Sequence, residues 1–173
     1  LDLSAYGAHL ENCSASLEAV LEAVRREEPQ WELFFSFYAA LAALLQRKAR
    51  TQEKLRRAWH EKDMAALREL CREDLPGLKA AAEAYAEAFR RQWLHSSKAP
   101  GLDVFDLRMG GQICRIEAAA ERLRAYLCGE ADTVEELDEA WLPFDPEEWE
   151  KGRRDMPAPF WHEIASPSNI ASI

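Results

Sequence analysis

The stretch that decides the fold is WELFFSFYAALAALL, from Trp31 to Leu45, in which 13 of the 15 residues are apolar. Crossing a bilayer takes about 20 predominantly apolar residues, so this stretch is too short to span a membrane. The polar run QRKARTQEK follows it directly. A helix that is apolar on every side is normally buried, and the sequence therefore predicts a buried central helix here.

The predicted central helix is longer than its apolar stretch and changes character halfway along. Pro29 can begin it, because proline lacks an N–H that the first helical turn would leave unused, and the helical pattern continues to Glu61. The second half, RKARTQEKLRRAWHEK, keeps only Leu55 and Trp59 as a narrow apolar stripe. We therefore expect the first half to be buried and the second half to reach toward solvent or a partner.

Helical periodicity predicts further helices before and after this one. A first helix is expected from Ala8 to Glu28. A short third helix follows Asp63, whose carboxylate can cap it, and Leu75-Pro76-Gly77 is expected to break it before a fourth helix runs to Ser96. The predicted inward faces of these three helices are Leu10, Cys13, Leu17, Val20 or Leu21 and Val24; Met64, Leu67 and Cys71; and Leu78, Ala82, Tyr85, Phe89 and Trp93.

A loop, SSKAPGLDVFD, is expected before a fifth helix from Gly111 to Leu127. A last short helix, TVEELDEAWL, starts with Thr133 as a candidate N-cap and Glu136 three positions on, which is a capping-box pattern. Strand signals are almost absent. The sequence thus predicts an all-α bundle of five to six helices over residues 1–142. The predicted seam of the fifth helix is Ile113, Ile116, Ala120, Leu123 and Leu127.

The C-terminal tail, residues 143–173, differs from the rest of the chain. Five of the eight prolines lie in it, which predicts irregular structure. It also holds four large aromatic residues, more than a disordered tail normally contains. We expect the tail to pack on the bundle or on a partner domain. These aromatic residues are Phe144, Trp149, Phe160 and Trp161.

Length, charge and cysteine content narrow the class of protein. The chain has 173 residues, which suits one domain with a tail, and a formal net charge of −9. A negative chain is repelled by nucleic acids and anionic membranes, so neither is a predicted partner. The N-terminus, LDLSAYGAHLENC, does not resemble a signal peptide. The four cysteines show no metal-binding spacing, and we expect Cys13, Cys71 and Cys114 to be buried free thiols in a cytoplasmic protein.

The common catalytic and metal-binding patterns are missing from the sequence. No Glu-x-x-His pair occurs, as a di-iron or di-manganese bundle would need, and no G-x-S-x-G motif occurs. Asp138-Glu139 could act as an acid pair, but its crowded acidic surroundings offer little of the desolvation that raises a carboxyl pKa. A solvated helix is the simpler interpretation. We predict no catalytic residue, no metal ligand and no cofactor in this chain.

Two further features allow either a ligand or a structural role. Gly110-Gly111 could present backbone N–H groups to an anion at a helix start, or allow a turn or close packing against another backbone. Arg108 and Arg115 flank the glycines and can bind a carboxylate or carbonyl. Trp93, Trp149 and Trp161 could stack on a sugar, although tryptophan is more often found in a core or an interface. For both features we favour a structural or interface role.

The segment from Trp93 to Leu142 resembles the C-terminal helical domain of a bacterial subgroup of glycoside hydrolase family 20, the exo-β-N-acetylhexosaminidases. The shared features are a Trp-Leu pair, a Lys and Gly loop, an Arg before paired glycines, an Arg-x-Glu, and an Arg-Leu-x-x-Tyr-Leu-x-Gly-Glu run. They correspond to Trp93, Leu94, Lys98, Gly101, Arg108, Gly110, Gly111, Arg115, Glu117, Arg122, Leu123, Tyr126, Leu127, Gly129 and Glu130.

This resemblance implies a larger parent enzyme with a small α/β domain, a catalytic TIM barrel and this helical domain. Such enzymes act in carbohydrate metabolism by removing terminal N-acetylhexosamine, with retention of configuration and with the substrate's acetamide as nucleophile. Their Asp-Glu pair lies at the end of a barrel strand, so Asp138-Glu139 on a predicted helix does not correspond to it. The chain also begins at Leu1 without a methionine. We expect it to be the non-catalytic C-terminal domain of such a hydrolase.

The predicted partners are the catalytic barrel of the parent chain and a second copy in a homodimer. The alternative is a free-standing helical module that binds another protein through its tail and second helix. We expect the contact surface to comprise the loop from Lys98 to Asp106 and a turn at Arg108, Gly110 and Gly111. The candidate interface residues are Trp93, Lys98, Arg108, Gly110, Gly111 and Arg115.

Overall fold

The computed structural model describes residues 3–139, with side chains from Gly7 onward, and every regular element in that part is helical. This confirms the predicted all-α fold class. The compact unit that holds α1–α5 ends at Val134, and α6 belongs to a second unit. The tail, 143–173, lies outside the described residues. The elements are α1 (Leu3–Glu27), the 3₁₀ turn η1 (Pro29–Trp31), α2 (Glu32–Glu61), α3 (Met64–Glu69), the π-helical segment η2 (Leu70–Asp74), α4 (Leu75–Ser96), α5 (Leu102–Cys128) and α6 (Glu135–Asp138).

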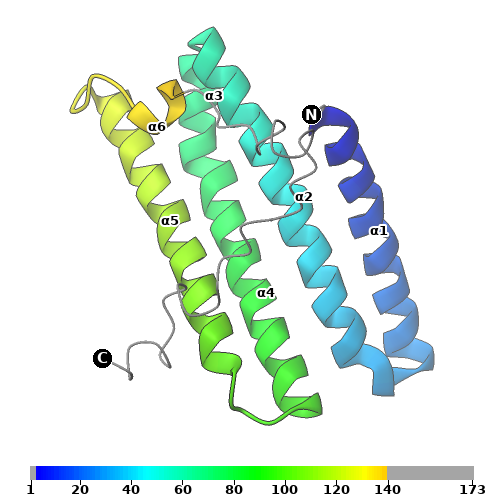
Figure 1. Ribbon diagram of the computed structural model, residues 1–173. Coiled ribbons are helices and arrows are strands. Elements are labelled where there is room, and N and C mark those ends of the chain that lie inside the picture. The colour runs from blue at the N-terminus through cyan, green and yellow to red at the C-terminus, as the bar shows by residue number, and fades with distance from the viewer. Residues whose placement is uncertain (1–2, 140–173) are drawn as a thin grey trace, which may run out of the picture. The chain divides into compact units, whose positions relative to one another are not determined.

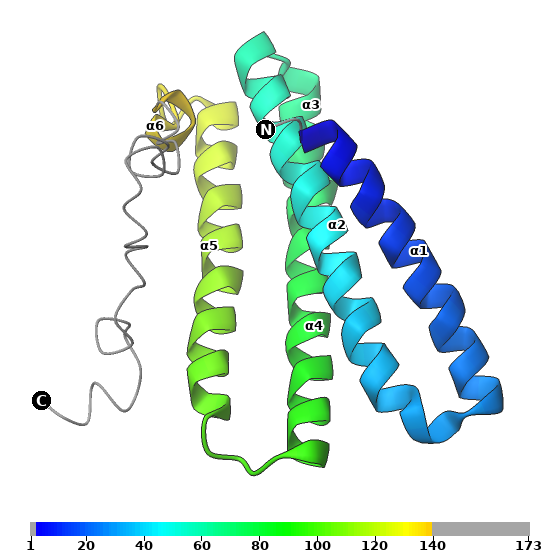
Figure 2. The same cartoon turned by 45° about the vertical axis from the view of Figure 1, so that its right-hand side comes forward.

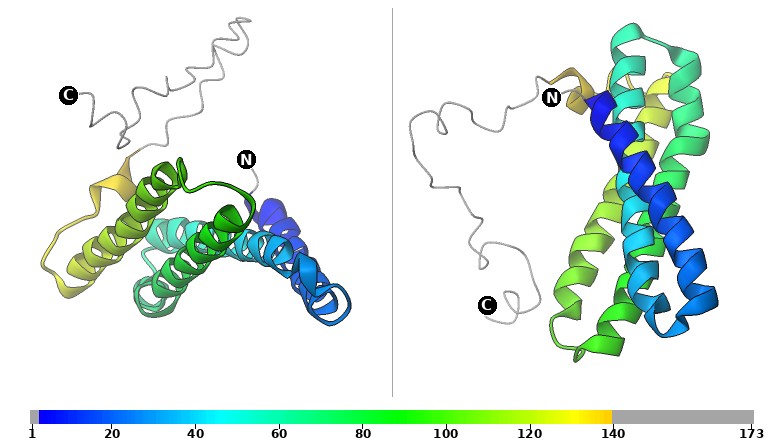
Figure 3. Two further views of the ribbon diagram at one scale, coloured as in Figure 1. Left: turned by 90° about the horizontal axis from the view of Figure 1, so that it is seen from below. Right: turned by 90° about the vertical axis from the view of Figure 1, so that its right-hand side faces the viewer.

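Helices α1, α2, α4 and α5 lie side by side in a row, each antiparallel to the next (Figures 1 and 2). Viewed end-on the row is curved, with α1 and α5 at its two ends (Figure 3). Segments α3 and η2 join α2 to α4 at one end of the row and also contact α5. A row of this kind, unlike a closed ring of helices, leaves one side of its inner helices without a helical neighbour.

The 3–4 spacing predicted the contact faces of α4 and α5 correctly. Leu78 and Ala82 of α4 are buried, as are Ala120 and Leu123 of α5, and the other predicted seam residues of these helices are half-buried. In α1 the buried seam contains Leu21, whereas Val20 stays 40% exposed. Helix α1 also begins at Leu3, five residues before the predicted start at Ala8.

The predicted helix break at Leu75-Pro76-Gly77 is wrong, because the chain stays helical through it. In η2 the backbone N–H of Leu75 donates to the carbonyl of Leu70, five residues back. Pro76 then falls in the first turn of α4, where a missing N–H costs little. A Cβ atom at Gly77 would collide with the guanidinium of Arg47. The glycine therefore leaves room for the Arg47 side chain beside α4, and it does not end a helix.

The prediction that the first half of α2 is buried and its second half exposed is also wrong. Trp59, in the polar half, is only 2% exposed and packs on Tyr126 of α5, with ring centroids 4.8 Å apart. In the apolar half, Phe34 and Tyr38 remain 40% exposed. Along this half α1 and α4 cover two sides of α2, whereas α3, η2 and α5 also contact the other half.

Two basic residues of α2, Arg47 and Lys54, lie on the side opposite its exposed aromatic residues, whereas Arg56 lies eighteen residues, or five turns, beyond Tyr38 on the same side. Arg47 lies nine residues, or two and a half turns, beyond Tyr38, and Lys54 lies nine beyond Leu45. Lys54 extends to the carboxylates of α3 and η2. Ion pairs that join separate elements include Arg50–Glu11, Arg25–Glu32, Lys54–Glu69, Lys54–Asp74, Lys79–Glu117 and Arg90–Asp106.

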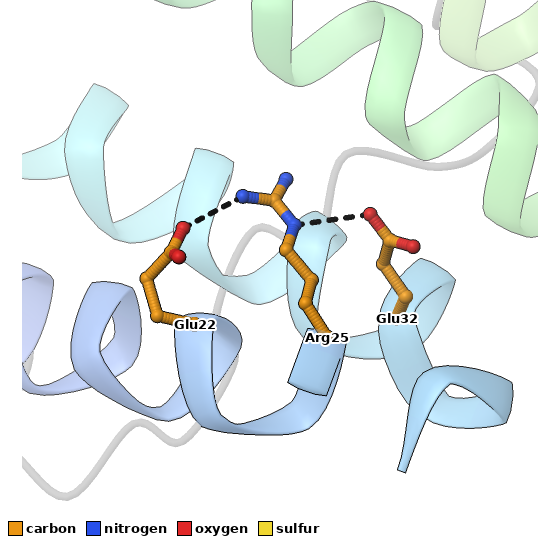
Figure 4. Close-up of polar contacts among 3 residues, drawn as sticks. All are labelled: Glu22, Arg25 and Glu32. Atoms are coloured by element: carbon orange, nitrogen blue, oxygen red, sulfur yellow. Dashed lines mark hydrogen bonds and ion pairs between the residues drawn. The ribbon is translucent and has the colours of Figure 1, made fainter. Parts of the chain in front are cut away.

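An exposed ion cluster holds the turn between α1 and α2 (Figure 4). Arg25 donates from Nε to Glu32 at 3.0 Å and from Nη1 to Glu22 at 2.9 Å. These hydrogen bonds, to Glu32 first and then to Glu22, raise the pKa of Arg25. Pro29 begins η1 within this turn, between Arg25 and Glu32, in agreement with its predicted place at a helix start. None of the helices in residues 3–139 combines the length and the apolarity that a membrane crossing requires.

Candidate interaction surface

Eight aromatic side chains from α2, α4 and α5, together with Trp31 of η1, form one continuous network of ring contacts. Phe37 of α2 bridges the helices, with its ring 5.7 Å from Tyr85 and 5.8 Å from Phe89 of α4. Phe105 of α5 then stacks on Phe89, with centroids 3.7 Å apart and planes within 10°. We call this the aromatic network: Trp31, Phe34, Phe35, Phe37, Tyr38, Tyr85, Phe89, Trp93 and Phe105.

Trp93 is the point where the network meets the loop between α4 and α5. Its ring stacks on Phe89 at 5.6 Å, and its indole Nε1 donates to the carbonyl of Lys98 at 2.7 Å. Gly101 lies beside the same ring in the left-handed conformation (φ 96°), where glycine is favoured. The structure thus brings the predicted pair Trp93 and Lys98 together. In this chain the indole N–H of the tryptophan binds the loop, and one face of its ring is covered by Phe89.

The predicted turn at Arg108, Gly110 and Gly111 is wrong, because α5 begins at Leu102 and runs straight through the glycine pair. Two interior glycines cost a helix roughly 1 kcal/mol each relative to alanine. The stacking of Phe105 on Phe89 fixes the first turn of α5 well before the glycines. The N–H groups of an interior turn bond to carbonyls four residues back, so the alternative of an anion cradle at a helix start is excluded as well.

The predicted interface residues therefore separate into two places on the structure. Trp93 and Lys98 form the loop corner, while Arg108, Gly111 and Arg115, three and four residues apart, share one side of α5. Gly110 is two positions from Arg108 and so points elsewhere on the helix. A Cβ added at either glycine would meet nothing within 4 Å in the described part of the chain. Their open surroundings fit an outer face of α5, and the interface role itself stays a prediction.

A second exposed surface, on α2 and its preceding turn, was missed by the sequence prediction. Trp31 is 54% exposed, and Phe34, Tyr38 and Leu45 are each 40% exposed. With the half-buried Leu41 they follow one another at steps of three, four, three and four residues, which places them on one side of the helix. This periodicity was visible in the sequence. It was hidden by the apolar residues on every other side of the same helix. We call these five residues the α2 stripe.

The most buried ion cluster lies at the other end of α2. Lys54 Nζ contacts Asp74 Oδ2 at 2.6 Å and Glu69 Oε1 at 2.8 Å, and its side chain is 23% exposed. Burial lowers the pKa of Lys54, but the hydrogen bonds to Asp74 and Glu69 outweigh that effect, and the pKa is raised above its ordinary value. This cluster ties α2 to α3 and η2, and is therefore structural.

The four cysteines are free, as predicted, but they are less buried than predicted. Cys13 and Cys71 are half-buried, and Cys114 and Cys128 are exposed. Cys114 was expected to be buried, yet it lies on the outer side of α5, which has no helical neighbour in the row. Burial is the main cause that raises the pKa of the Cys71 thiol, with Arg124 opposing it and Cys128 adding to it. A thiol with a raised pKa stays protonated at neutral pH and is therefore a poor nucleophile.

The carboxylates, histidines and thiols of residues 3–139 form no group of three placed to hold a metal ion. Asp138 and Glu139, the candidate acid pair, are both exposed at the end of α6. An exposed carboxylate stays hydrated, whereas a catalytic carboxylic acid needs desolvated surroundings. What this part of the chain does offer is contact surface: the α2 stripe and the outer side of α5.

Comparison with known proteins gives one clear result. The sequence profile of a family described as "Glycoside Hydrolase 20C C-terminal domain" matches residues 1–156. The match takes in every helix described above. No protein of curated function matches the chain.

Proposed function

The chain belongs to the family of glycoside hydrolase 20C C-terminal domains, and on that premise we propose that it is a non-catalytic domain of a β-N-acetylhexosaminidase that packs on the catalytic barrel and supports dimer contacts. The parent enzyme would remove terminal N-acetylhexosamine by the substrate-assisted, retaining route. The observation that carries the proposal is the family match, because it covers the whole helical unit under the description of a hydrolase's C-terminal domain.

Two structural features support a contact role. Large apolar side chains stay exposed on the α2 stripe, and exposed apolar patches often mark interaction sites. Arg108, Gly111 and Arg115 share one side of α5, and all three are exposed. Small residues let another backbone approach, and arginine can bind its carboxylates in a two-pronged geometry. We include a cytoplasmic location in the proposal, since all four cysteines are free thiols.

The proposal is tested in the intact hydrolase with the double substitution Arg108→Ala and Arg115→Ala. We expect weaker dimerisation or a lower unfolding temperature, with kcat for a chromogenic N-acetylglucosaminide within about twofold of wild type, because the lost interactions lie outside the reacting centre. Arg57→Ala and Arg72→Ala, at two other exposed positions, serve as the matched control. Normal assembly together with a large loss of kcat would contradict the proposal.

The alternative of a free-standing interaction module makes a different prediction. It requires that the helical unit act without a hydrolase attached to it. Deleting the domain from the intact enzyme should then leave the stability of the catalytic domain unchanged. Under the proposal above, the same deletion lowers the unfolding temperature of the catalytic domain, as differential scanning calorimetry would show.

A further inference from the structure

His9 and Cys13 of α1 place an imidazole and a thiol side by side at the surface of the helix. The two residues lie four positions, or about one turn, apart and so share one side of α1. The Nε2 atom of His9 is 3.5 Å from the Sγ atom of Cys13. His9 is exposed and Cys13 is half-buried. The pair is therefore open to an ion from solvent.

We infer that His9 and Cys13 together bind one Zn²⁺ ion through Nε2 and Sγ, with water molecules completing the coordination. The inference is independent of the proposed function, and it departs from the sequence prediction of a chain without metal ligands. Zinc bonds of ~2.3 Å to sulfur and ~2.1 Å to nitrogen, at the tetrahedral angle of ~109°, place the two donor atoms ~3.6 Å apart. The observed separation of 3.5 Å therefore already suits one zinc ion.

The chemistry of the two donors selects the class of metal. Thiolate and imidazole are preferred ligands of zinc and similar transition metals, whereas calcium and magnesium take oxygen ligands. When zinc binds, the Cys13 thiol releases its proton to solvent, and the thiolate and the imidazole replace two of the ion's water ligands. The carboxylates, histidines and thiols of residues 3–139 provide no third ligand. The site is therefore an open one that keeps bound water.

The helix holds the two donors in place without help from other elements. Two ligands one turn apart on one face of a helix are also how the H-E-x-x-H motif binds zinc. Glu11 lies two positions from each donor and so points to another side of α1. Both of its carboxylate oxygens accept hydrogen bonds from Arg50 Nη2 at 2.7 Å. Glu11 is thus engaged with α2, and the charge of Arg50 is paired.

The other three cysteines provide matched controls, because none has a histidine three or four residues before or after it. Cys114 is the clearest of them, since it is an exposed free thiol on α5. Its neighbours one turn away are Gly110 and Ala118. A metal that bound any accessible thiol would bind Cys114 as well as Cys13. A metal held by the pair would bind at Cys13 alone.

The inference is tested by titrating the full chain with Co²⁺, a coloured substitute for Zn²⁺. We expect a thiolate-to-cobalt charge-transfer band that saturates at one ion per chain and is displaced by Zn²⁺. Cys13→Ser should abolish the band. His9→Ala should weaken binding at least about tenfold, because the second ligand on the same helix binds intramolecularly. Cys114→Ser and His95→Ala, at exposed positions on other helices, should leave the titration unchanged.

Alkylation of the four thiols gives a second readout that does not depend on colour. The wild-type chain is treated with iodoacetamide with and without Zn²⁺, and the modified cysteines are counted by peptide mass spectrometry. We expect Zn²⁺ to slow the alkylation of Cys13 and to leave Cys114 and Cys128 unaffected. Equal protection of all exposed thiols, or equal Co²⁺ binding by wild type and His9→Ala, would overturn the inference. Circular dichroism of each variant confirms that the helices are retained.

Discussion

The two halves of α2 show that burial here depends on neighbours and not on composition. The apolar half, near Phe34 and Tyr38, has helices on two sides and keeps these rings 40% exposed. The polar half has α3, η2 and α5 around it as well, and Trp59 there is 2% exposed. The polar half is thus enclosed by its neighbours, whereas the apolar half keeps one side exposed.

The largest expected difference between the two halves concerns their tryptophans. Trp59 packs on Tyr126 and lies under the ammonium of Lys62, 4.2 Å from the ring centroid. Replacing a buried aromatic by alanine costs about 3–5 kcal/mol, so Trp59→Ala should lower the free energy of unfolding by that amount. Trp31→Ala, at a 54% exposed position, should cost below about 1 kcal/mol. Urea unfolding of both variants, followed by circular dichroism, measures the contrast.

Equal losses of unfolding free energy for Trp59→Ala and Trp31→Ala would contradict the difference between the two halves of α2. They would mean that the apolar half is as firmly packed as the polar half in the isolated chain.

Sequence reasoning predicted the faces of the helices better than it predicted their ends or their exposure. The 3–4 repeats of α4 and α5 depend only on local spacing, and Leu78, Ala82 and Leu123 are buried as predicted. Pro76-Gly77 and Gly110-Gly111 predicted helix boundaries that the structure does not have. A π-helical turn accommodates Pro76, and stacking of Phe105 on Phe89 starts α5 before its glycines. Both corrections depend on tertiary contacts that no local pattern contains.

The exposed stripe escaped prediction for a related reason. A helix that is apolar all round is read as surrounded, and Trp31–Leu45 fits that description. The row provides only two neighbours along this half, so one apolar side is left open. For the candidate site, the sequence pointed to Trp93 and Lys98, which do meet. It could not show which apolar face of α2 would remain without a neighbour.

A smaller effect is expected at the helix starts that flank the two halves. Asp63 accepts hydrogen bonds from the N–H groups of Ala65 and Ala66, both at 3.0 Å, and so caps α3 over the buried half. Asp63→Ala should cost about 1 kcal/mol, and Asp63→Asn much less. Glu28, which precedes η1 and makes no cap bond, is the matched control. If Glu28→Ala lowers the free energy of urea unfolding as much as Asp63→Ala does, the loss does not come from the hydrogen bonds of the Asp63 cap.

The smallest effect concerns the charges at the two ends of α2. Lys54 is held by Asp74 and Glu69, and Lys54→Met should cost about 0.5 kcal/mol at neutral pH, since Glu69 is half exposed and solvent screens the pair. Arg25 lies in an exposed cluster at the other end of α2, and Arg25→Met should lower the free energy of unfolding by less than Lys54→Met does. Urea unfolding in low and high salt measures both.

The pH dependence of the Lys54 contribution has a defined sign. Its pKa is raised in the folded protein above the ordinary 10.5, so its stabilisation is fully present below pH 10.5 and is lost as pH rises through the folded pKa. Burial also raises the pKa of Cys71 above 9.0 and of Tyr85 above 10.0. Both shifts therefore also make the folded protein less stable as the pH rises. The difference between wild type and Lys54→Met isolates the lysine. That difference should be constant from pH 7 to 9 and should shrink above pH 10.5, whereas a difference that grows with alkali would show that Lys54 is not held as a cation by Asp74 and Glu69.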